Sequence, residues 1–175
     1  FSTRPDTIYG VTFLAISPNH QLSIDIFEKD ETIKLFLEKC KDLKTAEADI
    51  ATAEKLGIDT GKKVIHPITK EKLPVWIGNF VLLDYGTGVV MGVPGHDERD
   101  FEFATKYKIN IKQVIKNDKD DLPISDKGIL INSDNFDGMT SEDASKEIIN
   151  KLIELKCGNS LIQFRLRDWG ISRQR

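Results

Sequence analysis

Residues 86–100 read GTGVVMGVPGHDERD, and this stretch contains the transitions that decide the fold. Gly86 to Gly88 predict a turn, the apolar run Val89 to Val93 predicts a short strand, and Pro94–Gly95 ends it. Asp97 to Lys108 then predicts a helix, because acidic residues in a first helical turn complement the helix dipole. The stretch therefore places carboxylates and a histidine beside an apolar strand.

Strands and helices alternate irregularly on both sides of this stretch. Apolar residues at helical spacing predict a helix from Asp30 to Cys40, and a capping-box spacing begins a second helix from Thr140 to Lys156. Apolar segments around Gly78–Asn79 predict a β-hairpin over 73–83. Further expected elements are extended structure over 1–15, a helix start at Ser17–Pro18, a helix over 45–56, and strands over 63–68, 109–115, 128–131 and 161–166. The fold class is therefore α+β, or mixed α/β, in one domain spanning residues 1–175.

The composition is that of a globular protein. Hydrophobic residues make up 39% and charged residues 30% of the 175, and the formal net charge of −3 lends no support to a nucleic-acid partner. No apolar run approaches the length that spans a membrane, and the segment after Phe1 is not a signal peptide. Cys40 and Cys157 are far apart and predict reduced core thiols in a cytosolic protein.

Several common sites are not supported by the sequence. Residues 57–63 resemble a phosphate loop but are one residue short, so they predict a helix C-cap and turn. The glycines at 86–92 do not match the dinucleotide fingerprint, and the three scattered histidines do not have zinc-ligand spacing. A serine on a Gly-x-Ser-x-Gly turn is missing too, although a catalytic triad is not excluded by composition.

Physical arguments alone do not decide the roles of two polar segments. Residues 2–7 (STRPDT) form either a capped turn or a polar rim around a small substrate. Asp97 and Glu98 are explained by the helix dipole, whose effect fades within the first turn. Asp100 is explained less well, and its carboxylate is suited to hold a substrate ammonium group.

Together with the closing segment 165–175 (RLRDWGISRQR), these segments resemble the editing domain, an inserted connective polypeptide, of bacterial-type leucyl-tRNA synthetases. Ser2 stands where the family motif Thr-Thr-Arg-Pro-Asp-Thr has its first threonine, and residues 86–100 match a second motif nearly throughout. The resemblance covers the whole chain. It implies a compact β-barrel-like core with surrounding helices, excised from a larger synthetase, and a return strand over 165–175 that leads toward the catalytic body.

The resemblance also implies residue roles. Thr7 narrows the pocket and excludes leucine, Asp100 binds the substrate α-ammonium group, and Ser2 with Thr3 and Arg4 surrounds the scissile ester and the terminal adenosine. The catalytic candidates are Asp100, Thr3 and Arg4. The residues implied to line the pocket are Tyr85, Met91, Val93, His96 and Asp97.

The implied activity is post-transfer editing, which hydrolyses isoleucyl-, norvalyl- or methionyl-tRNA for leucine. A synthetic pocket separates side chains that differ by one methylene only about 10–200-fold, so a second sieve is required. The expected partners are the 3′ terminal adenosine of that tRNA and the rest of the synthetase, in a cytoplasmic monomer. No metal or other cofactor is expected in this domain, because ATP and magnesium serve the absent catalytic domain.

The alternatives are a tRNA-docking module without hydrolytic activity, a free-standing trans-editing deacylase, and an unrelated esterase that uses His96 and Asp97. Residues 165–175 carry four arginines and one aspartate, so the rest of the chain is acidic. An acidic domain suits a pocket that receives an ammonium group.

Overall fold

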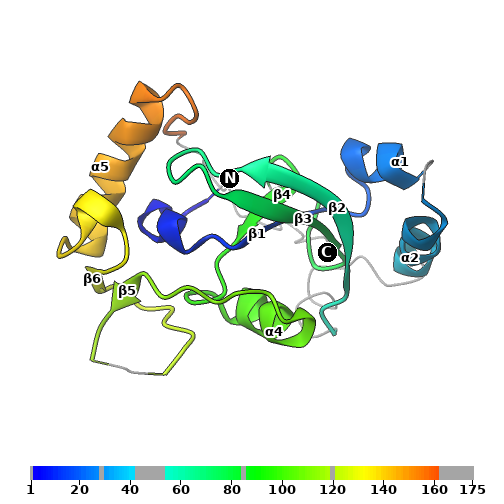
Figure 1. Cartoon of the computed structure of the whole chain (residues 1–175), viewed down its shortest axis with the longest axis horizontal. Helices are drawn as coiled ribbons and strands as arrows, with labels where there is room; N and C mark the ends of the chain where they lie inside the picture. The colour runs from blue at the N-terminus through cyan, green and yellow to red at the C-terminus, as the bar shows by residue number, and fades with distance from the viewer. Residues whose placement is uncertain (1, 28–29, 42–53, 84–85, 119–120, 162–175) are drawn as a thin grey trace, which may run out of the picture.

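A four-stranded open sheet forms the centre of the molecule (Figure 1). The computed structural model describes residues 2–27, 30–41, 54–83, 86–118 and 121–161. The strand order is β2-β3-β1-β4, with β1 parallel to β3 and the other pairs antiparallel. The strands are β1 (Phe13–Ile16), β2 (Gly57–Ile65), β3 (Lys72–Gly78) and β4 (Val89–Gly92).

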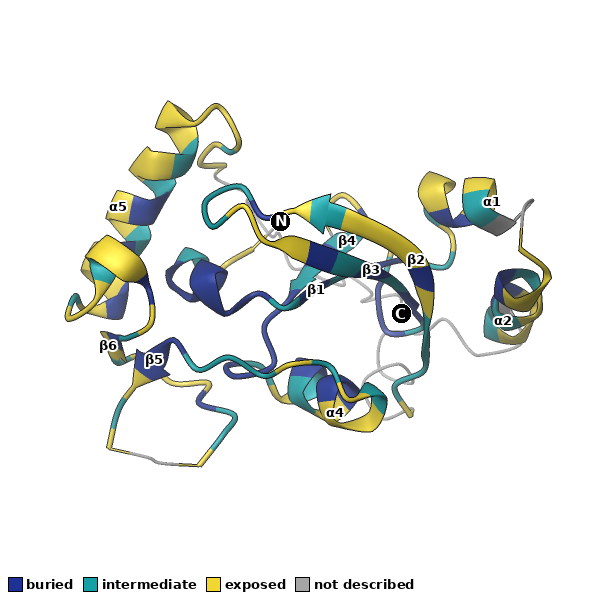
Figure 2. Ribbon diagram, viewed as in Figure 1, coloured by how far each residue is buried: buried dark blue, intermediate teal, exposed yellow. Residues whose placement is uncertain are grey.

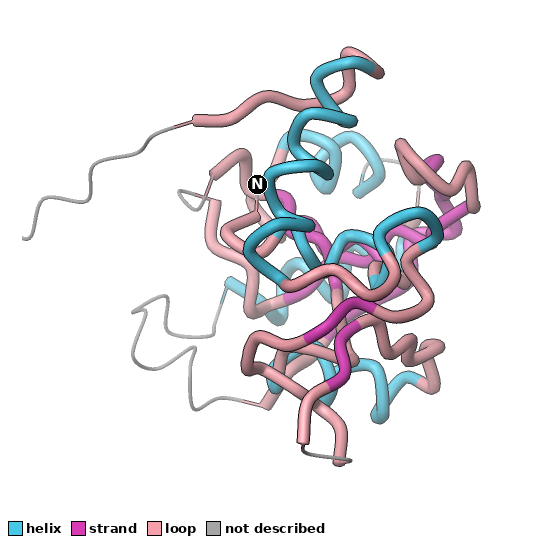
Figure 3. The backbone as a smooth tube through the Cα atoms, turned by 90° about the vertical axis from the view of Figure 1, so that its left-hand side faces the viewer, coloured by secondary structure: helices cyan, strands magenta, loops and turns pink. Residues whose placement is uncertain are grey.

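Helices surround this sheet, and a separate two-stranded ladder lies at one end (Figure 1). In Figure 3 that end, with α5 and the β5–β6 ladder, faces the viewer. The helices are η1 (Pro5–Gly10), α1 (Gln21–Phe27), α2 (Glu31–Lys41), α4 (Glu98–Tyr107), η2 (Asp134–Phe136) and α5 (Ser141–Glu154), and the ladder pairs β5 (Ile115–Lys116) with β6 (Ile129–Leu130).

The central strand β1 is packed on both faces (Figure 2). Phe13 and Ala15 belong to an aromatic cluster around Phe103 of α4, whereas Ile16 packs with Ile33 of α2. This division follows from the alternation of side chains along a strand. A third cluster joins η1 to the far end of the molecule, where α5 contributes Ala144 and Ile148, so η1 is buried although it is short.

The expected β-barrel-like core is wrong. In the described part of the chain the edge strands β2 and β4 pair only with β3 and β1, so the sheet does not close. Four short strands are too few for the tilt and stagger that close a barrel, and α2 and α4 bury the sheet faces instead. The architecture is mixed α/β, as the sequence predicts.

Two further expectations are wrong because tertiary packing overrides a local pattern. The hairpin at Gly78–Asn79 is absent: β3 ends there, and Phe80 turns inward to pack against Phe103 at a ring-centroid distance of 5.0 Å. Residues 57–63 are not a helix C-cap but part of β2, whose register shifts between Asp59 and Lys63.

At the N-terminus, extended structure is confirmed for β1, but η1 replaces it over Pro5–Gly10. The helix expected from Ser17–Pro18 begins only at Gln21, and the strands expected over 109–115 and 128–131 shorten to two residues each. The three helices expected at 30–40, 97–108 and 140–156 are confirmed as α2, α4 and α5. The segments 45–53, 162–166 and 165–175 lie outside the described residues.

The cysteine prediction is corrected in part. Cys40 is half-buried, and burial raises the pKa of its thiol to about 11, whereas Cys157 is exposed on the surface. Both are free, but Cys157 is not a core residue because it follows the end of α5. None of the described helices is long and apolar enough to cross a membrane.

Candidate active site

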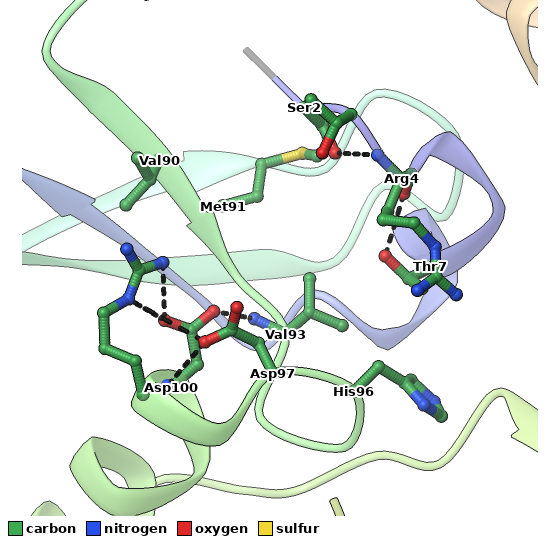
Figure 4. A pocket seen from close by; sticks show the side chains of 11 residues that line it. Ser2, Arg4, Thr7, Val90, Met91, Val93, His96, Asp97 and Asp100 are labelled. Atoms are coloured by element: carbon green, nitrogen blue, oxygen red, sulfur yellow. Dashed lines mark hydrogen bonds and ion pairs between the residues drawn. The ribbon is translucent and has the colours of Figure 1, made fainter. Parts of the chain in front are cut away.

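A cleft lies where three segments meet: the residues that lead into η1, the end of β4, and the first turn of α4 (Figure 4). It brings together every predicted site residue that the structure describes, whereas Tyr85 lies outside the described residues. The lining residues are Ser2, Thr3, Arg4, Thr7, Val90, Met91, Val93, His96, Asp97, Arg99 and Asp100.

Thr7 is held on one side of the cleft by the turn that begins η1. Pro5 occupies the first helical position, where its missing N–H costs nothing, and the Thr7 N–H donates to the Arg4 carbonyl over 3.1 Å. The Thr7 hydroxyl donates to the same carbonyl over 2.9 Å. The hydroxyl proton is therefore engaged, and the orientation of this buried side chain is fixed.

The Arg4 side chain is bound within the same segment. Its guanidinium makes bonds of 2.8–3.2 Å to both carboxylate oxygens of Asp6, which is 1% exposed, and donates to the Ser125 carbonyl over 2.8 Å. A bidentate pair of this kind fixes the guanidinium plane. Arg4 therefore stabilises the η1 turn, and its charge is already matched by Asp6.

Asp100 lies across the cleft, and two elements position it. Asp97 is the N-cap of α4 and accepts from the Asp100 N–H over 3.0 Å, which places Asp100 in the first helical turn. The Asp100 carboxylate, 2% exposed, accepts from the Val93 N–H over 2.9 Å and pairs with Arg99 at 3.1 Å. Burial raises the pKa of this carboxyl to about 6, against the lowering effect of Arg99.

His96 is a structural member of the cleft wall. Its Nε2 accepts from the N–H groups of Val114 and Ile115 over 2.9 and 3.2 Å, so the ring proton lies on Nδ1 and is donated to the Ile124 carbonyl over 2.9 Å. Burial lowers the pKa of the ring. Since both nitrogens are engaged, His96 is not available as the base of an esterase.

The comparisons with known proteins agree with this geometry. The family model described as "Leucyl-tRNA synthetase, editing domain" matches residues 1–153. The chain belongs to this family of leucyl-tRNA synthetase editing domains. It is 52% identical to a leucine–tRNA ligase of Hahella chejuensis and 50% identical to one of Marinobacter nauticus, over 100% of this chain and 21% of each relative. The chain thus spans about a fifth of the length of these relatives.

A solved structure shares the fold of this editing domain. It is the crystal structure of the ternary complex of the Agrobacterium radiobacter K84 agnB2 LeuRS, tRNA and LeuAMS. The TM-score is 0.70 at 31% identity, over 95% of this chain and 18% of that one.

Two residues of the editing-domain cleft were missed by the sequence prediction. Arg99 pairs with Asp100, and its position in the first turn of α4, next to that carboxylate, was the available signal. Val90 has no distinguishing signal, because it reads as one more apolar residue of β4. Within the described ranges, no three His, Cys, Asp or Glu side chains are grouped as ligands for a metal ion.

Proposed function

We propose that this domain hydrolyses the ester bond of tRNA for leucine that carries a wrong amino acid, as the post-transfer editing site of a leucyl-tRNA synthetase. The observation that carries the proposal is the position of Asp100, a buried carboxylate in a cleft whose opposite side holds Thr7. One side of the cleft thus offers a charge, and the other limits the size of a side chain.

In this proposal Asp100 binds the α-ammonium group of the aminoacyl ester. Its carboxylate already accepts from the Val93 N–H and from Arg99, so its direction is fixed before the substrate arrives. With a pKa near 6, the group is mostly ionised at neutral pH and has the charge that an ammonium requires. An anchored ammonium group also fixes the position of the neighbouring ester carbonyl.

Thr7 acts as the sieve. Its hydroxyl is bound to the Arg4 carbonyl, so the side chain does not rotate freely, and its methyl group meets the side chain of the amino acid. The apolar wall formed by Val90, Met91 and Val93 accommodates that side chain. Leucine is rejected by steric overlap at Thr7, while isoleucine, norvaline and methionine are admitted.

Hydrolysis of the ester requires an oriented water and donors for the developing oxyanion. Thr3 is exposed at the cleft, and its hydroxyl makes no hydrogen bond to another described residue, so it is available for this task. Ser2 accepts from the Arg4 N–H over 3.0 Å and holds the same segment near the ester and the terminal adenosine. A solved relative is described as a complex with tRNA, which supports tRNA as the partner.

The test is release of the amino acid from isoleucyl-tRNA for leucine, with correctly charged leucyl-tRNA as the matched substrate. Wild-type protein should hydrolyse the first and spare the second. Binding of the tRNA without release would instead support a docking module. Equal rates for the 175-residue chain and the full-length synthetase would support a free-standing deacylase. Because no cofactor is expected, a metal chelator should leave the rate unchanged.

A further inference from the structure

A buried histidine outside the cleft connects the sheet to the turn that bears Thr7. His66 follows β2 and is 2% exposed. Its Nε2 lies 3.0 Å from the carbonyl oxygen of Ile8, the residue next to Thr7 in η1. The two residues are 58 positions apart in the chain, so this contact exists only in the folded protein.

The hydrogen bonds of the ring determine what each nitrogen does. Nδ1 accepts from the N–H groups of Ile68 and Thr69 over 3.2 and 3.0 Å, and it therefore carries no proton. The proton is on Nε2, which donates to the Ile8 carbonyl. One nitrogen thus caps the connection between β2 and β3, and the other holds η1.

Short 3₁₀ helices have poor hydrogen-bond geometry, so the position of η1 depends on contacts with other segments: the Arg4–Ser125 bond, the core cluster with α5, and His66. The Ile8 carbonyl also accepts from the Val11 N–H, but that bond is internal to the turn and 3.2 Å long. His66 instead ties the turn to the sheet through β2 and β3. A steric sieve depends on the position of one methyl group, since a displacement of about 1 Å at a site can change a rate about 100-fold.

We infer that His66 is a positioning residue for amino-acid discrimination: its bond to the Ile8 carbonyl sets where Thr7 lies in the cleft. The inference rests on the proposed editing function, in which Thr7 excludes leucine. His66 is not among the residues that line the cleft. Through the position of Thr7, His66 affects which amino acid the domain releases from tRNA.

Two substitutions separate the two roles of the ring. In His66→Asn the side-chain oxygen takes the place of Nδ1 and caps the connection, but the side chain is too short to reach Ile8. In His66→Gln the amide nitrogen takes the place of Nε2 and donates to the Ile8 carbonyl, but the cap is lost. In the full-length synthetase, we expect His66→Asn to raise hydrolysis of leucyl-tRNA about tenfold relative to isoleucyl-tRNA, a part of the about 10–200-fold by which an apolar pocket separates closely similar side chains. We expect His66→Gln to discriminate like wild type.

A second measurement does not depend on hydrolysis. In the 175-residue chain with methyl-labelled threonine, the Thr7 resonance, assigned with Thr7→Ser, should move in His66→Asn and stay near its wild-type position in His66→Gln. An unmoved Thr7 resonance in a folded His66→Asn protein would overturn the inference, as would equal loss of discrimination in both variants. If wild-type enzyme releases neither amino acid, the proposed function fails, and the resonance still decides the role of His66.

Discussion

Replacing Asp100 with asparagine should make the protein more stable and the editing reaction slower. Asparagine has nearly the shape of a protonated aspartate and keeps an oxygen for the Val93 N–H, but it has no charge, and its NH2 group takes the place of the oxygen that accepts from Arg99. The magnitude follows from burial, which raises the pKa of Asp100 from its ordinary value of 3.8 to about 6. Because a tenfold change in proton affinity corresponds to about 1.4 kcal/mol, the ionised carboxylate costs about 3 kcal/mol in the folded protein at neutral pH.

The sign follows from proton linkage. The folded-state pKa of Asp100 lies above the unfolded-state value, so its contribution to stability is complete below pH 3.8 and is lost as the pH rises through about 6. The Asp100→Asn variant keeps this contribution to stability at high pH, because its side chain does not ionise. At pH 7 we therefore expect the free energy of unfolding of the variant to exceed that of wild type by up to about 3 kcal/mol, measured by urea denaturation.

The same substitution should slow the release of isoleucine from mischarged tRNA. A hydrogen bond to a charged group contributes about 1.5–3 kcal/mol, so loss of the bond to the ammonium should lower kcat/KM roughly ten- to a hundredfold. For the same reason, wild-type hydrolysis should decline as the pH falls below about 6 and Asp100 becomes protonated.

A matched control comes from the other end of the molecule. Thr140 is the N-cap of α5 and accepts from the Asp143 N–H over 3.2 Å, far in the chain from the cleft segments. Thr140→Ala should cost about 1 kcal/mol of stability and leave hydrolysis unchanged. If Asp100→Asn instead lowers stability at pH 7 and keeps normal hydrolysis, the carboxylate is only structural and the proposed ammonium anchor is wrong.

Three further predictions concern other parts of the domain. Thr7→Ala should open the sieve so that correctly charged leucyl-tRNA is deacylated; continued sparing of that substrate would contradict the role of Thr7. Burial lowers the pKa of both His66 and His96, so NMR should find the His96 ring still neutral just below pH 6.5, and in the Asp100→Asn background the two histidines together should make the free energy of unfolding fall as the pH drops below 6.5; a His96 ring that titrates at or above 6.5 would refute this assignment. A Cβ at Gly92 would overlap the Phe13 ring, so Gly92→Ala should cost about 1–3 kcal/mol in urea denaturation, and an unchanged midpoint would show that the ring can move.

The helices with local signals could be predicted from the sequence. The Thr140–Asp143 capping pair and the acidic first turn of α4 involve residues at most a few positions apart, so neighbouring residues already determine them. The conformations of Gly78–Asn79 and of the η1 segment do not follow from local sequence, because they depend on Phe103 and on the α5 end of the core, which are distant in the chain.

The sequence by itself determined which residues could form the site, because the hydroxyls of 2–7 and the carboxylates of 97–100 lie in two short segments. Only the tertiary structure decided how they are used. It pairs Arg4 with Asp6, removes His96 from acid–base chemistry, buries Asp100 and holds η1 through His66. These outcomes depend on burial and on contacts between distant segments, and the environment that a fold creates changes the chemistry of a side chain more than its neighbours in sequence do.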